Sequence, residues 1–405
     1  MPPRPASALL LALAYLAFIS LGLPDAVLGV AWPSVRDTFG LPQALLGLPL
    51  AITAVAYFLS GLLAGRLMQV VGIGLLLAGS TALVAAGLFG FAAAPAFALF
   101  LLATPVVGFG SGAIDAAINT YAARNFSPKH MSWVHAAYAV GAMAGPVIFT
   151  VILAGGRSWR LGYATVGAIL AVLAVAFVLV RRRWEAGEPE PAIVLDAPGG
   201  VDPVMLAGRP VGAGAAVRSI GVWLQIAIFF VYSGVEVTAG QWSYTVLTEE
   251  RGLSAAAAGT WVAVYWGGLL AGRLVLGLVV ERFGQVRLIR FATAGALLST
   301  GLFAIPGQAW GVAALPLISF SLASIYPGLM AETPRRVGEG LAPHAVGFQV
   351  SAATAGIAVI PGLTGLVVER LGLVAVGPIL AAGALALLVL HERLVTVADR
   401  PAASG

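Results

Sequence analysis

Two acidic side chains lie in otherwise apolar stretches of the sequence, at matching places in its two halves. Asp25 lies within FISLGLPDAVLGVAW (Phe18–Trp32), and Glu236 lies 211 residues later within FFVYSGVEVTAGQW (Phe229–Trp242). A charged group at the centre of a membrane helix costs at least ~2.5 kcal/mol, so an acid there is expected to have a function. The repeated acid predicts a duplicated chain in which both carboxylates take part in the chemistry.

A third acid, Asp115, lies four residues before Asn119, so the two side chains share one face of a helix. An acid and an amide one turn apart offer acceptors and donors to the hydroxyls of a solute. The alternative is a hydrogen bond between helices that only holds the bundle together. A carboxylate can also load and release a proton, so we predict proton-coupling roles for Asp25, Asp115 and Glu236.

Aromatic and amide side chains in the other apolar stretches are candidates for binding a solute. Trp261 and Tyr265 are four residues apart and offer ring faces for stacking, although Trp and Tyr also collect at membrane interfaces. His135 titrates near neutral pH and is either a proton relay or a hydrated residue near a helix end. The predicted solute-binding residues are Asn119, Gln241, Trp242, Trp261, Tyr265, Gln349, Trp32, Tyr57 and His135.

The composition places these residues in a membrane. The chain is 60% hydrophobic and 10% charged, with a mean hydropathy of +0.97, whereas a soluble domain is about one-quarter charged. Unsatisfied backbone groups cannot face lipid, and long apolar runs such as 75–94 lack the alternation of a barrel strand. The sequence therefore predicts an all-α membrane protein.

Several kinds of chemistry are excluded or unsupported. The chain has no Cys, which excludes disulfides and thiolate metal sites. It carries no nucleophile elbow and no phosphate-binding loop motif. We expect no enzymatic activity, no metal and no cofactor other than a coupling ion, H+.

Spans of about 20 apolar residues predict twelve transmembrane helices in two halves. The predicted domains are an N-terminal half at 1–181, a cytoplasmic linker at 182–217 rich in Pro, Gly and Glu, and a C-terminal half with a short tail at 218–405. The helices are predicted at 8–34, 43–68, 72–94, 97–122, 130–154, 161–181, 218–246, 254–279, 286–305, 309–333, 343–369 and 373–393.

Further matches between the halves support the duplication. The heptapeptide GLLAGRL occurs at 61–67 and again at 268–274, in the second predicted helix of each half. Proline pairs at similar offsets are Pro105 with Pro316 and Pro146 with Pro361. The two halves are therefore predicted to be pseudo-symmetric.

The basic residues predict the orientation. Of 22 Lys and Arg residues, 17 fall on the side of the N-terminus, so both termini and the linker are predicted to be cytoplasmic. This distribution is a topology signal and does not form a face for nucleic acid. We expect a multi-pass protein of a bacterial-type inner membrane, a monomer whose partners are the lipid bilayer and a small-molecule solute.

Two six-helix halves, a cytoplasmic central loop and a Gly-Arg pair near the turn after the second helix of each half together resemble the major facilitator superfamily. The resemblance implies the facilitator fold and a cytoplasmic gate built on the loop signature G-x-x-x-D-R-x-G-R-R. The copy GRLVLGLVVERFGQVR keeps an acid, an arginine and a glycine of this signature, whereas GRLMQVVGIG lacks the acid and the trailing arginines. The gating residues that the resemblance implies are Arg66, Arg273, Glu281 and Arg282.

The fourth helix (GFGSGAIDAAINTYAARN) and the tenth (LASIYPGLMAETP) resemble the fucose and glucose permease branch of sugar:proton symporters. That branch implies carboxylates in helices 1 and 4, where Asp25 and Asp115 fall. We therefore predict a secondary active transporter that works by alternating access and couples uptake of a small neutral polar solute, a monosaccharide, to protons.

Other functions remain open. GAMAGP in the fifth helix is a fragment of the motif typical of drug antiporters, so a proton-coupled exporter of drugs or other amphipathic compounds is the alternative. A membrane receptor or sensor is a second alternative, although it has no need of two symmetric halves. An anion transporter is disfavoured because no Arg or Lys lies in the central third of any predicted span.

Overall fold

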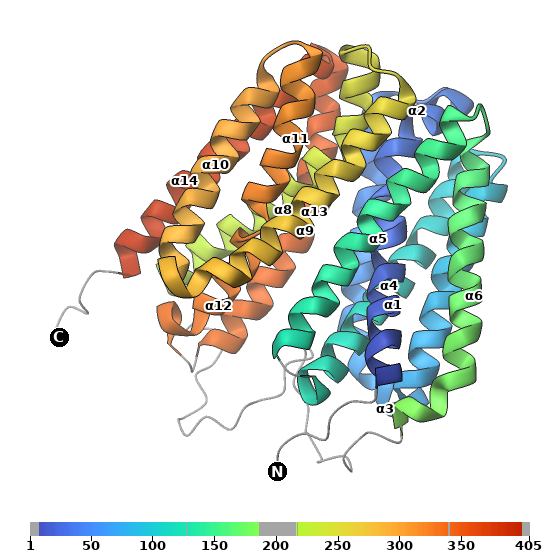
Figure 1. Ribbon diagram of the computed structural model, residues 1–405, viewed down its shortest axis with the longest axis horizontal. Coiled ribbons are helices and arrows are strands. Elements are labelled where there is room, and N and C mark those ends of the chain that lie inside the picture. Colours follow the sequence, from blue (N-terminus) through green and yellow to red (C-terminus); the bar gives the residue numbers. More distant parts are fainter. Residues whose placement is uncertain (1–7, 127, 186–215, 217, 339–340, 399–405) are drawn as a thin grey trace. The chain divides into compact units, whose positions relative to one another are not determined.

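All regular structure in the described part of the chain is helical (Figure 1). The computed structural model describes residues 8–126, 128–185, 216, 218–338 and 341–398. Ten helical stretches among these residues are long and apolar enough to cross a membrane.

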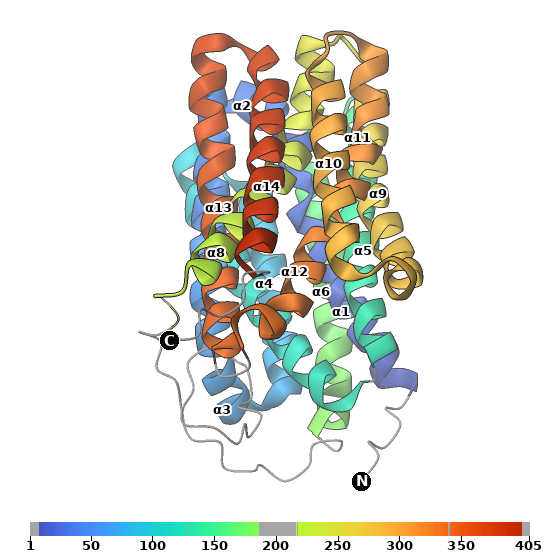
Figure 2. The same ribbon diagram turned by 90° about the vertical axis from the view of Figure 1, so that its left-hand side faces the viewer.

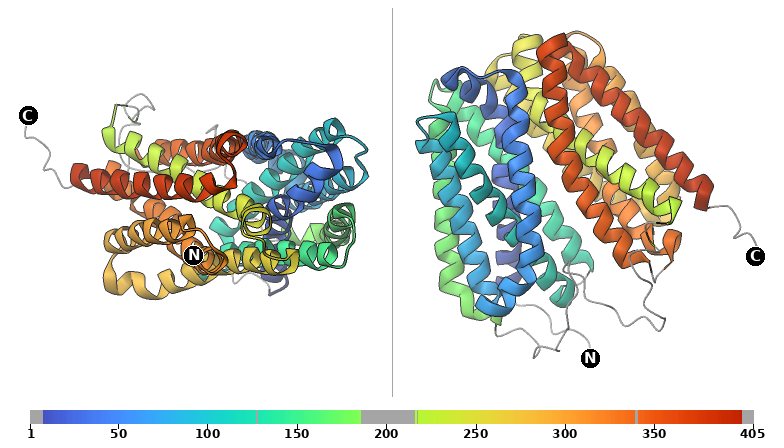
Figure 3. Two further views of the ribbon diagram at one scale, coloured as in Figure 1. Left: turned by 90° about the horizontal axis from the view of Figure 1, so that it is seen from above. Right: turned by 180° about the vertical axis from the view of Figure 1, so that it is seen from behind.

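The predicted twelve-helix fold is confirmed. One of the ten stretches contains two predicted spans, because α3 (Gly47–Ala93) has a turn at Gly72 with φ 76° and ψ 158°, a conformation that favours glycine. The blue ribbon of α3 accordingly folds back on itself (Figure 3). In addition, α9 (Ala255–Phe283) has 29 residues and is long enough to span a membrane.

The chain forms two compact units, each of which is described by itself. Unit 1 comprises Met1–Pro42, Leu48–Asp202 and Ala255–Ala263, and unit 2 comprises Gln43–Gly47, Pro203–Ser254 and Val264–Gly405. Two short segments, 43–47 and 255–263, are grouped differently from the predicted halves. Most of the predicted linker lies outside the described residues, so its boundaries stay a prediction.

Unit 1 contains the early helices of the chain. A proline bends the first span: α1 ends at Asp25 directly after Pro24, and α2 begins at Val27. This agrees with a proline that lacks the N–H of a regular helix. The helices of unit 1 are α1 (Ala8–Asp25), α2 (Val27–Phe39), most of α3, α4 (Phe97–Asn125), α5 (Pro128–Ala154) and α6 (Trp159–Glu185).

In unit 2, α14 packs against both α8 and α10 (Figure 2). The tenth predicted span is broken between α11 and α12, around Ser324. The elements of unit 2 are η1 (Gln43–Leu46), α8 (Ile220–Thr245), the π-helical turn η2 (Val246–Glu250), most of α9, α10 (Gln285–Ala304), α11 (Gln308–Leu322), α12 (Ile325–Val337), α13 (Ala342–Leu371), η3 (Leu373–Ala375) and α14 (Val376–Ala398).

The same close helix crossing occurs once in each unit. A Cβ atom on Gly141 of α5 would lie 2.1 Å from the carbonyl oxygen of Ile19 on α1, and a Cβ on Gly356 of α13 would lie 2.0 Å from that of Phe230 on α8. Phe230 follows Ile19 by 211 residues, the offset that also separates the two acids of these helices. The predicted duplication is therefore present as two equivalent backbone contacts.

Arginines on the predicted outer side cap the C-termini of helices. In unit 1, Arg160 donates hydrogen bonds to the carbonyl oxygens of Ala92 and Ala94 at the C-terminus of α3, and its guanidinium lies 4.4 Å from the Trp159 ring. The last carbonyls of a helix lack partners within the helix and carry partial negative charge, so a cation stabilises them. This accounts for a basic residue on the predicted outer side.

We predict that Gly141→Ala lowers the melting temperature by several degrees, because the added methyl forces α5 away from α1. Gly61→Ala is the matched control, since its Cβ meets nothing within 4 Å and replacing glycine in a helix gains about 1 kcal/mol of helix propensity. Thermal unfolding in detergent, followed by tryptophan fluorescence, measures both. Equal melting temperatures for the two variants would contradict the close crossing.

Candidate functional site

Four helices of unit 1 bring five polar side chains together. Tyr138 of α5 donates a hydrogen bond to Asp25 of α1 over 3.0 Å, and Asn119 of α4 donates one to Asp115 over 2.9 Å. The hydroxyl of Tyr57 from α3 lies beside the Asp115 carboxylate, and the charges of the two acids interact. All five side chains are half-buried. We call this group the carboxylate cluster.

The crossing of α1 and α5 positions one side of the carboxylate cluster. Asp25 lies three residues after Gly22, and Tyr138 lies three residues before Gly141. A Cβ on Gly22 would lie 2.2 Å from the carbonyl oxygen of Tyr138. Only glycines allow two helices this close, and the phenol of Tyr138 then reaches the carboxylate of Asp25.

A second close crossing positions the other side of the carboxylate cluster. A Cβ on Gly112 of α4 would lie 2.2 Å from the carbonyl oxygen of Tyr57 on α3. Asp115 follows Gly112 by three residues, so it lies on nearly the same face of α4. Asn119 follows one turn later and fixes the carboxylate of Asp115 from its own helix.

The carboxylate cluster combines two acids with three neutral groups. Two carboxylates close enough to repel each other disfavour the doubly ionised state, so such a pair can hold one proton between them. The tyrosine hydroxyls and the Asn119 amide can donate to whichever carboxylate is charged. Tyr138 is a partner of Asp25 that the sequence analysis missed. The proton-coupling roles of Asp25 and Asp115 stay a prediction.

Unit 2 contains a different polar group around the third predicted acid. Glu236 of α8 interacts electrostatically with Arg273 of α9, and the hydroxyl of Tyr232 lies beside its carboxylate. The hydroxyl of Tyr265 donates a hydrogen bond to the backbone oxygen of Glu236 over 2.7 Å. We call Glu236, Arg273 and Tyr232 the charge-paired centre.

The position of Arg273 corrects the sequence analysis. Arg273 is half-buried and lies in the central third of α9, so the statement that no span carries a central Arg is wrong. The reason is that α9 continues to Phe283, beyond the predicted end at 279, which moves the helix centre toward Arg273. The absence of a central Arg can therefore no longer be used as an argument against an anion transporter.

The other predicted gating residues are exposed. Glu281 and Arg282 lie in the last turn of α9, which is followed by Gly284 with φ 76°, and Arg66 lies on α3. None of the three has an ion pair in the part of the chain that the structure describes. Their role in gating stays a prediction.

Gln349 lies in a buried amide group of unit 2. Its Nε2 donates to the Thr333 hydroxyl over 2.9 Å and to Oε1 of Gln225, and all three side chains have 0% exposure. The group joins α8, α12 and α13. Gln349 is thus held by protein groups, and binding of a solute there stays a prediction. The sequence offered no signal that would pair it with Gln225.

Most of the other predicted binding residues are packed inside their units. Trp242 donates from Nε1 to the carbonyl oxygen of Pro361 over 3.2 Å. His135 is exposed, with its ring edge-on to Phe18 at 5.3 Å between centroids, and Trp261 is half-buried on α9. Side chains with 2% exposure or less are Trp32, Gln241, Trp242 and Tyr265.

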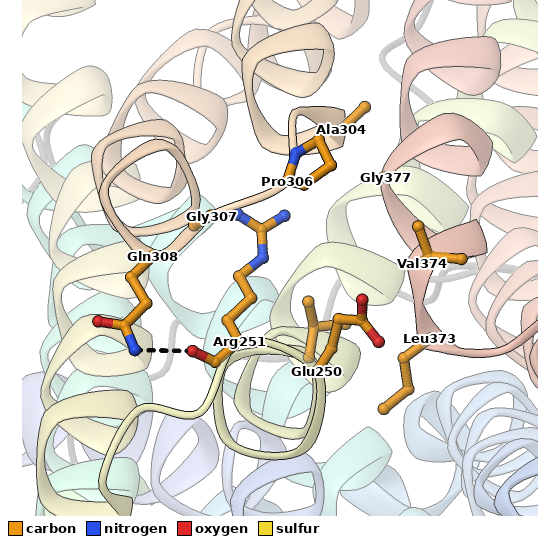
Figure 4. A pocket seen from close by; sticks show the side chains of 10 residues that line it. Glu250, Arg251, Ala304, Pro306, Gly307, Gln308, Leu373, Val374 and Gly377 are labelled. Carbon is orange, nitrogen blue, oxygen red and sulfur yellow. Dashed lines mark hydrogen bonds between the residues drawn. The ribbon is translucent and has the colours of Figure 1, made fainter.

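A cavity of about 210 Å³ lies in unit 2, at the end of η2 (Figure 4). Arg251 points from one side toward the turn that follows α10 and donates to the carbonyl oxygens of Gly307, at 2.8 Å, and Phe303. Gln308 donates to the backbone oxygen of Arg251 over 2.8 Å. The guanidinium therefore caps the C-terminal end of α10. None of the three predicted acids lines the cavity.

No group of three His, Cys, Asp or Glu side chains that could hold a metal occurs among the described residues. The expected absence of a metal stays an expectation.

Comparison with known proteins establishes the family. The family model of the Major Facilitator Superfamily matches residues 14–361 of the chain. The chain belongs to the major facilitator superfamily. It is thus a multi-pass membrane transporter, from a family that is not enzymatic.

Two solved structures are similar to this facilitator. That of the nucleoside transporter NupG has a TM-score of 0.72 and 17% identity, covering 97% of this chain and 98% of that one. That of the E. coli fucose:proton symporter FucP has a TM-score of 0.63 and 17% identity, covering 96% and 99%. These likenesses show the fold.

One match in sequence is short. The Saccharomyces cerevisiae protein named Bypass of stop codon protein 6 is 38% identical to this facilitator over 66 residues, which is 16% of this chain and 13% of that protein. The aligned segment thus spans a small part of either protein.

We predict that Tyr138→Phe lowers the free energy of unfolding by about 1–3 kcal/mol, because the Asp25 carboxylate loses a donor. Tyr163→Phe is the matched control, since the buried hydroxyl of Tyr163 has no hydrogen-bond partner among the described residues. Thermal unfolding of both variants in detergent gives the comparison. A loss in Tyr163→Phe as large as that in Tyr138→Phe would show that the bond to Asp25 contributes nothing.

Proposed function

We propose that this facilitator is a proton-coupled symporter of a small neutral polar solute, with Asp25 and Asp115 holding the coupling proton. The observation that carries the proposal is the grouping of the two acids with neutral donors in unit 1: Tyr138 donates to Asp25 over 3.0 Å, and Asn119 donates to Asp115 over 2.9 Å. Two like charges at short range bind a proton between them and release it when their surroundings change. Coupling needs a group of this kind, and alternating access supplies the change of surroundings.

The groups around the acids differ between the two units, and this supports Asp25 and Asp115, rather than Glu236, as the groups that hold the coupling proton. Glu236 faces the cation Arg273, and an opposite charge nearby favours the ionised form of a carboxylate. Asp115 has instead the neutral partners Tyr57 and Asn119. Glu236 is therefore the weaker candidate for carrying the proton, although its sequence context matched that of Asp25.

The class of solute follows from the neutral groups and from the similar proteins. Carboxylate and amide side chains one turn apart suit hydroxyl groups, which both donate and accept hydrogen bonds. The two similar structures are those of a nucleoside transporter and a fucose:proton symporter. We propose a hydroxyl-bearing solute, either a monosaccharide or a nucleoside, with H+ as the coupling ion.

The proposal includes the orientation in a bacterial-type inner membrane, with both termini cytoplasmic. It is supported by the 17 of 22 basic residues on one side. Arg182 and Arg183 lie in the last turn of α6, where cations also suit the negative end of the helix dipole.

We predict that Asp25→Asn abolishes proton-driven accumulation of the solute and spares counterflow exchange, because exchange needs no net proton movement. Asp37→Asn is the control: Asp37 is 70% exposed and pairs with its neighbour Arg36. Uptake into proteoliposomes, with and without a pH gradient, measures both reactions. Accumulation by Asp25→Asn at the rate of the unchanged protein would contradict the proposal.

The solute for that assay comes from a thermal-shift screen of the purified protein against sugars, nucleosides and common drugs. Stabilisation by sugars or nucleosides is the expected result. Stabilisation by drugs alone, with proton-driven export of the same compounds, would favour the exporter instead.

A further inference from the structure

We propose that the cavity at the end of η2 in unit 2 binds a small planar aromatic molecule that carries one N–H group, such as indole. Binding there goes beyond the proposed function, because none of the three predicted acids lines this cavity. The ligand class follows from the equivalent place in unit 1, where the protein's own aromatic side chains fill the space.

The two units end a helix at equivalent places. In unit 1, α3 ends at Ala93, and in unit 2, α10 ends at Ala304, 211 residues later. The helices that follow, α4 and α11, begin at the same offset. An arginine caps both helix ends, Arg160 from α6 in unit 1 and Arg251 from the end of η2 in unit 2. The surroundings of the two helix ends can therefore be compared residue by residue.

Unit 1 fills the space beside this helix end with aromatic rings. The Trp159 ring, which is 3% exposed, lies 5.9 Å from that of Phe39 and 6.1 Å from that of Phe100, measured between centroids. The Phe97 ring lies 6.2 Å from that of Phe39 and 6.0 Å from that of Phe100. The guanidinium of Arg160 lies 4.4 Å from the Trp159 ring. The indole of Trp159 is thus surrounded by rings and a cation.

Unit 2 has no aromatic side chain at the four equivalent positions. At the offset of 211 residues, the equivalents of Phe39, Phe97 and Phe100 are Glu250, Gln308 and Gly311, and at the offset of 215 residues that relates Gly141 to Gly356, the equivalent of Trp159 is Val374.

The cavity of about 210 Å³ lies where these rings are missing. Three of the four equivalent residues, Glu250, Gln308 and Val374, line it. The Arg251 guanidinium occupies the place of the fourth ring, since a Cβ on Gly311 would lie 2.3 Å from its Nη1. Unit 2 therefore keeps the arginine cap and lacks the indole beside it.

The lining of the cavity suits a flat ring with one donor. Figure 4 shows Arg251 on one side and Leu373 and Val374 on the other, and Pro306 adds a further apolar wall. A guanidinium attracts an aromatic ring nearby, as that of Arg160 does in unit 1. The Nε–H of Arg251 is buried without a hydrogen-bond partner in the described part of the chain, and an N–H can also point at a ring face.

The carboxylate of Glu250 selects a ligand with an N–H group. A carboxylate only accepts hydrogen bonds, and that of Glu250 has no ion pair within 4.0 Å among the described residues. The N–H of an indole is a donor only. It can therefore bond to Glu250 while the rest of the ring contacts the apolar walls.

The size and the opening of the cavity agree with such a ligand. A cavity of about 150 Å³ lined by apolar side chains binds benzene, so about 210 Å³ accommodates a two-ring compound. Glu250, Gln308 and Val374 are exposed. The ligand can therefore enter from the solution on the predicted outer side.

The test measures binding of indole to the purified full-length protein in detergent by isothermal titration calorimetry. Protein-free micelles are the blank, because indole partitions into detergent. We expect saturable binding and a higher melting temperature with indole, since a ligand of the folded state stabilises it. Val374→Trp supplies the indole side chain that unit 1 has and is expected to abolish both effects. Val389→Trp is the matched control: Val389 is 50% exposed against 52% for Val374, does not line the cavity, and its replacement is expected to keep both effects.

A second comparison tests the N–H group without depending on the Val374→Trp variant. In 1-methylindole a methyl group replaces the N–H hydrogen. We expect this compound to bind about fivefold more weakly than indole, the factor that a hydrogen bond of ordinary strength contributes. Glu250→Leu replaces an exposed side chain and removes the acceptor. It is expected to bind both compounds with equal affinity.

Any of three results would overturn the proposal. They are the absence of saturable indole binding, indole binding that folded Val374→Trp leaves unchanged, and equal affinity of the unchanged protein for indole and 1-methylindole. None of them affects the proposed function, because the cavity contains neither Asp25 nor Asp115. Loss of proton-driven accumulation in Asp25→Asn likewise leaves indole binding unaffected.

Discussion

The close contact between the backbones of α1 and α5 is the constraint on which the rest of unit 1 depends. The carbonyl oxygen of Ile19 occupies the space that a side chain on Gly141 would need. This contact sets the distance at which Tyr138 reaches Asp25. A wider crossing would break this hydrogen bond in an apolar surrounding, where losing a bond to a polar group is costly. The packing of α5 against α1 at glycines thus also determines the position of Tyr138 relative to Asp25.

Unit 2 repeats the scaffold and changes the chemistry. The crossing of α8 and α13 at Gly356 is equivalent to that of α1 and α5. At the 215-residue offset of the two crossing glycines, however, the position equivalent to Tyr138 is Ala353, so Glu236 has no tyrosine from that helix. Its partners come from Tyr232 on its own helix and Arg273 on α9. A duplicated frame therefore presents two acids with neutral partners in one unit and one acid with a cation in the other.

Several threonine side chains in the spans are satisfied within their own helix, unlike Asp25. Thr81, Thr104 and Thr150 each donate to the carbonyl oxygen four residues earlier in the same helix. Such bonds need no neighbouring helix. A carboxylate has no donor of its own when ionised and must find one on another residue. Asp25, whose donor Tyr138 comes from another helix, therefore depends on the tertiary structure.

The sequence by itself determined the membrane class, the all-α fold, the duplication and the short list of acids. These properties follow from the apolar composition, from the length of the spans and from offsets between repeats, all of which are written along the chain. The helix bend at Pro24 was also predictable, because a missing N–H acts within one turn.

Only the tertiary structure decided which side chains meet. The pairing of Asp25 with Tyr138 spans 113 residues and depends on the rotation of two helices about their axes, which hydrophobic patterning does not fix where all faces of a helix are apolar. The amide group of Gln225, Thr333 and Gln349 is hidden in the sequence for the same reason. Arg273 lies in the central third of α9 because the helix continues four residues beyond its predicted end at 279, which the apolar pattern did not reveal. The sequence shows which polar residues lie in the spans, and the close packing of helices at glycines determines which partners those residues contact.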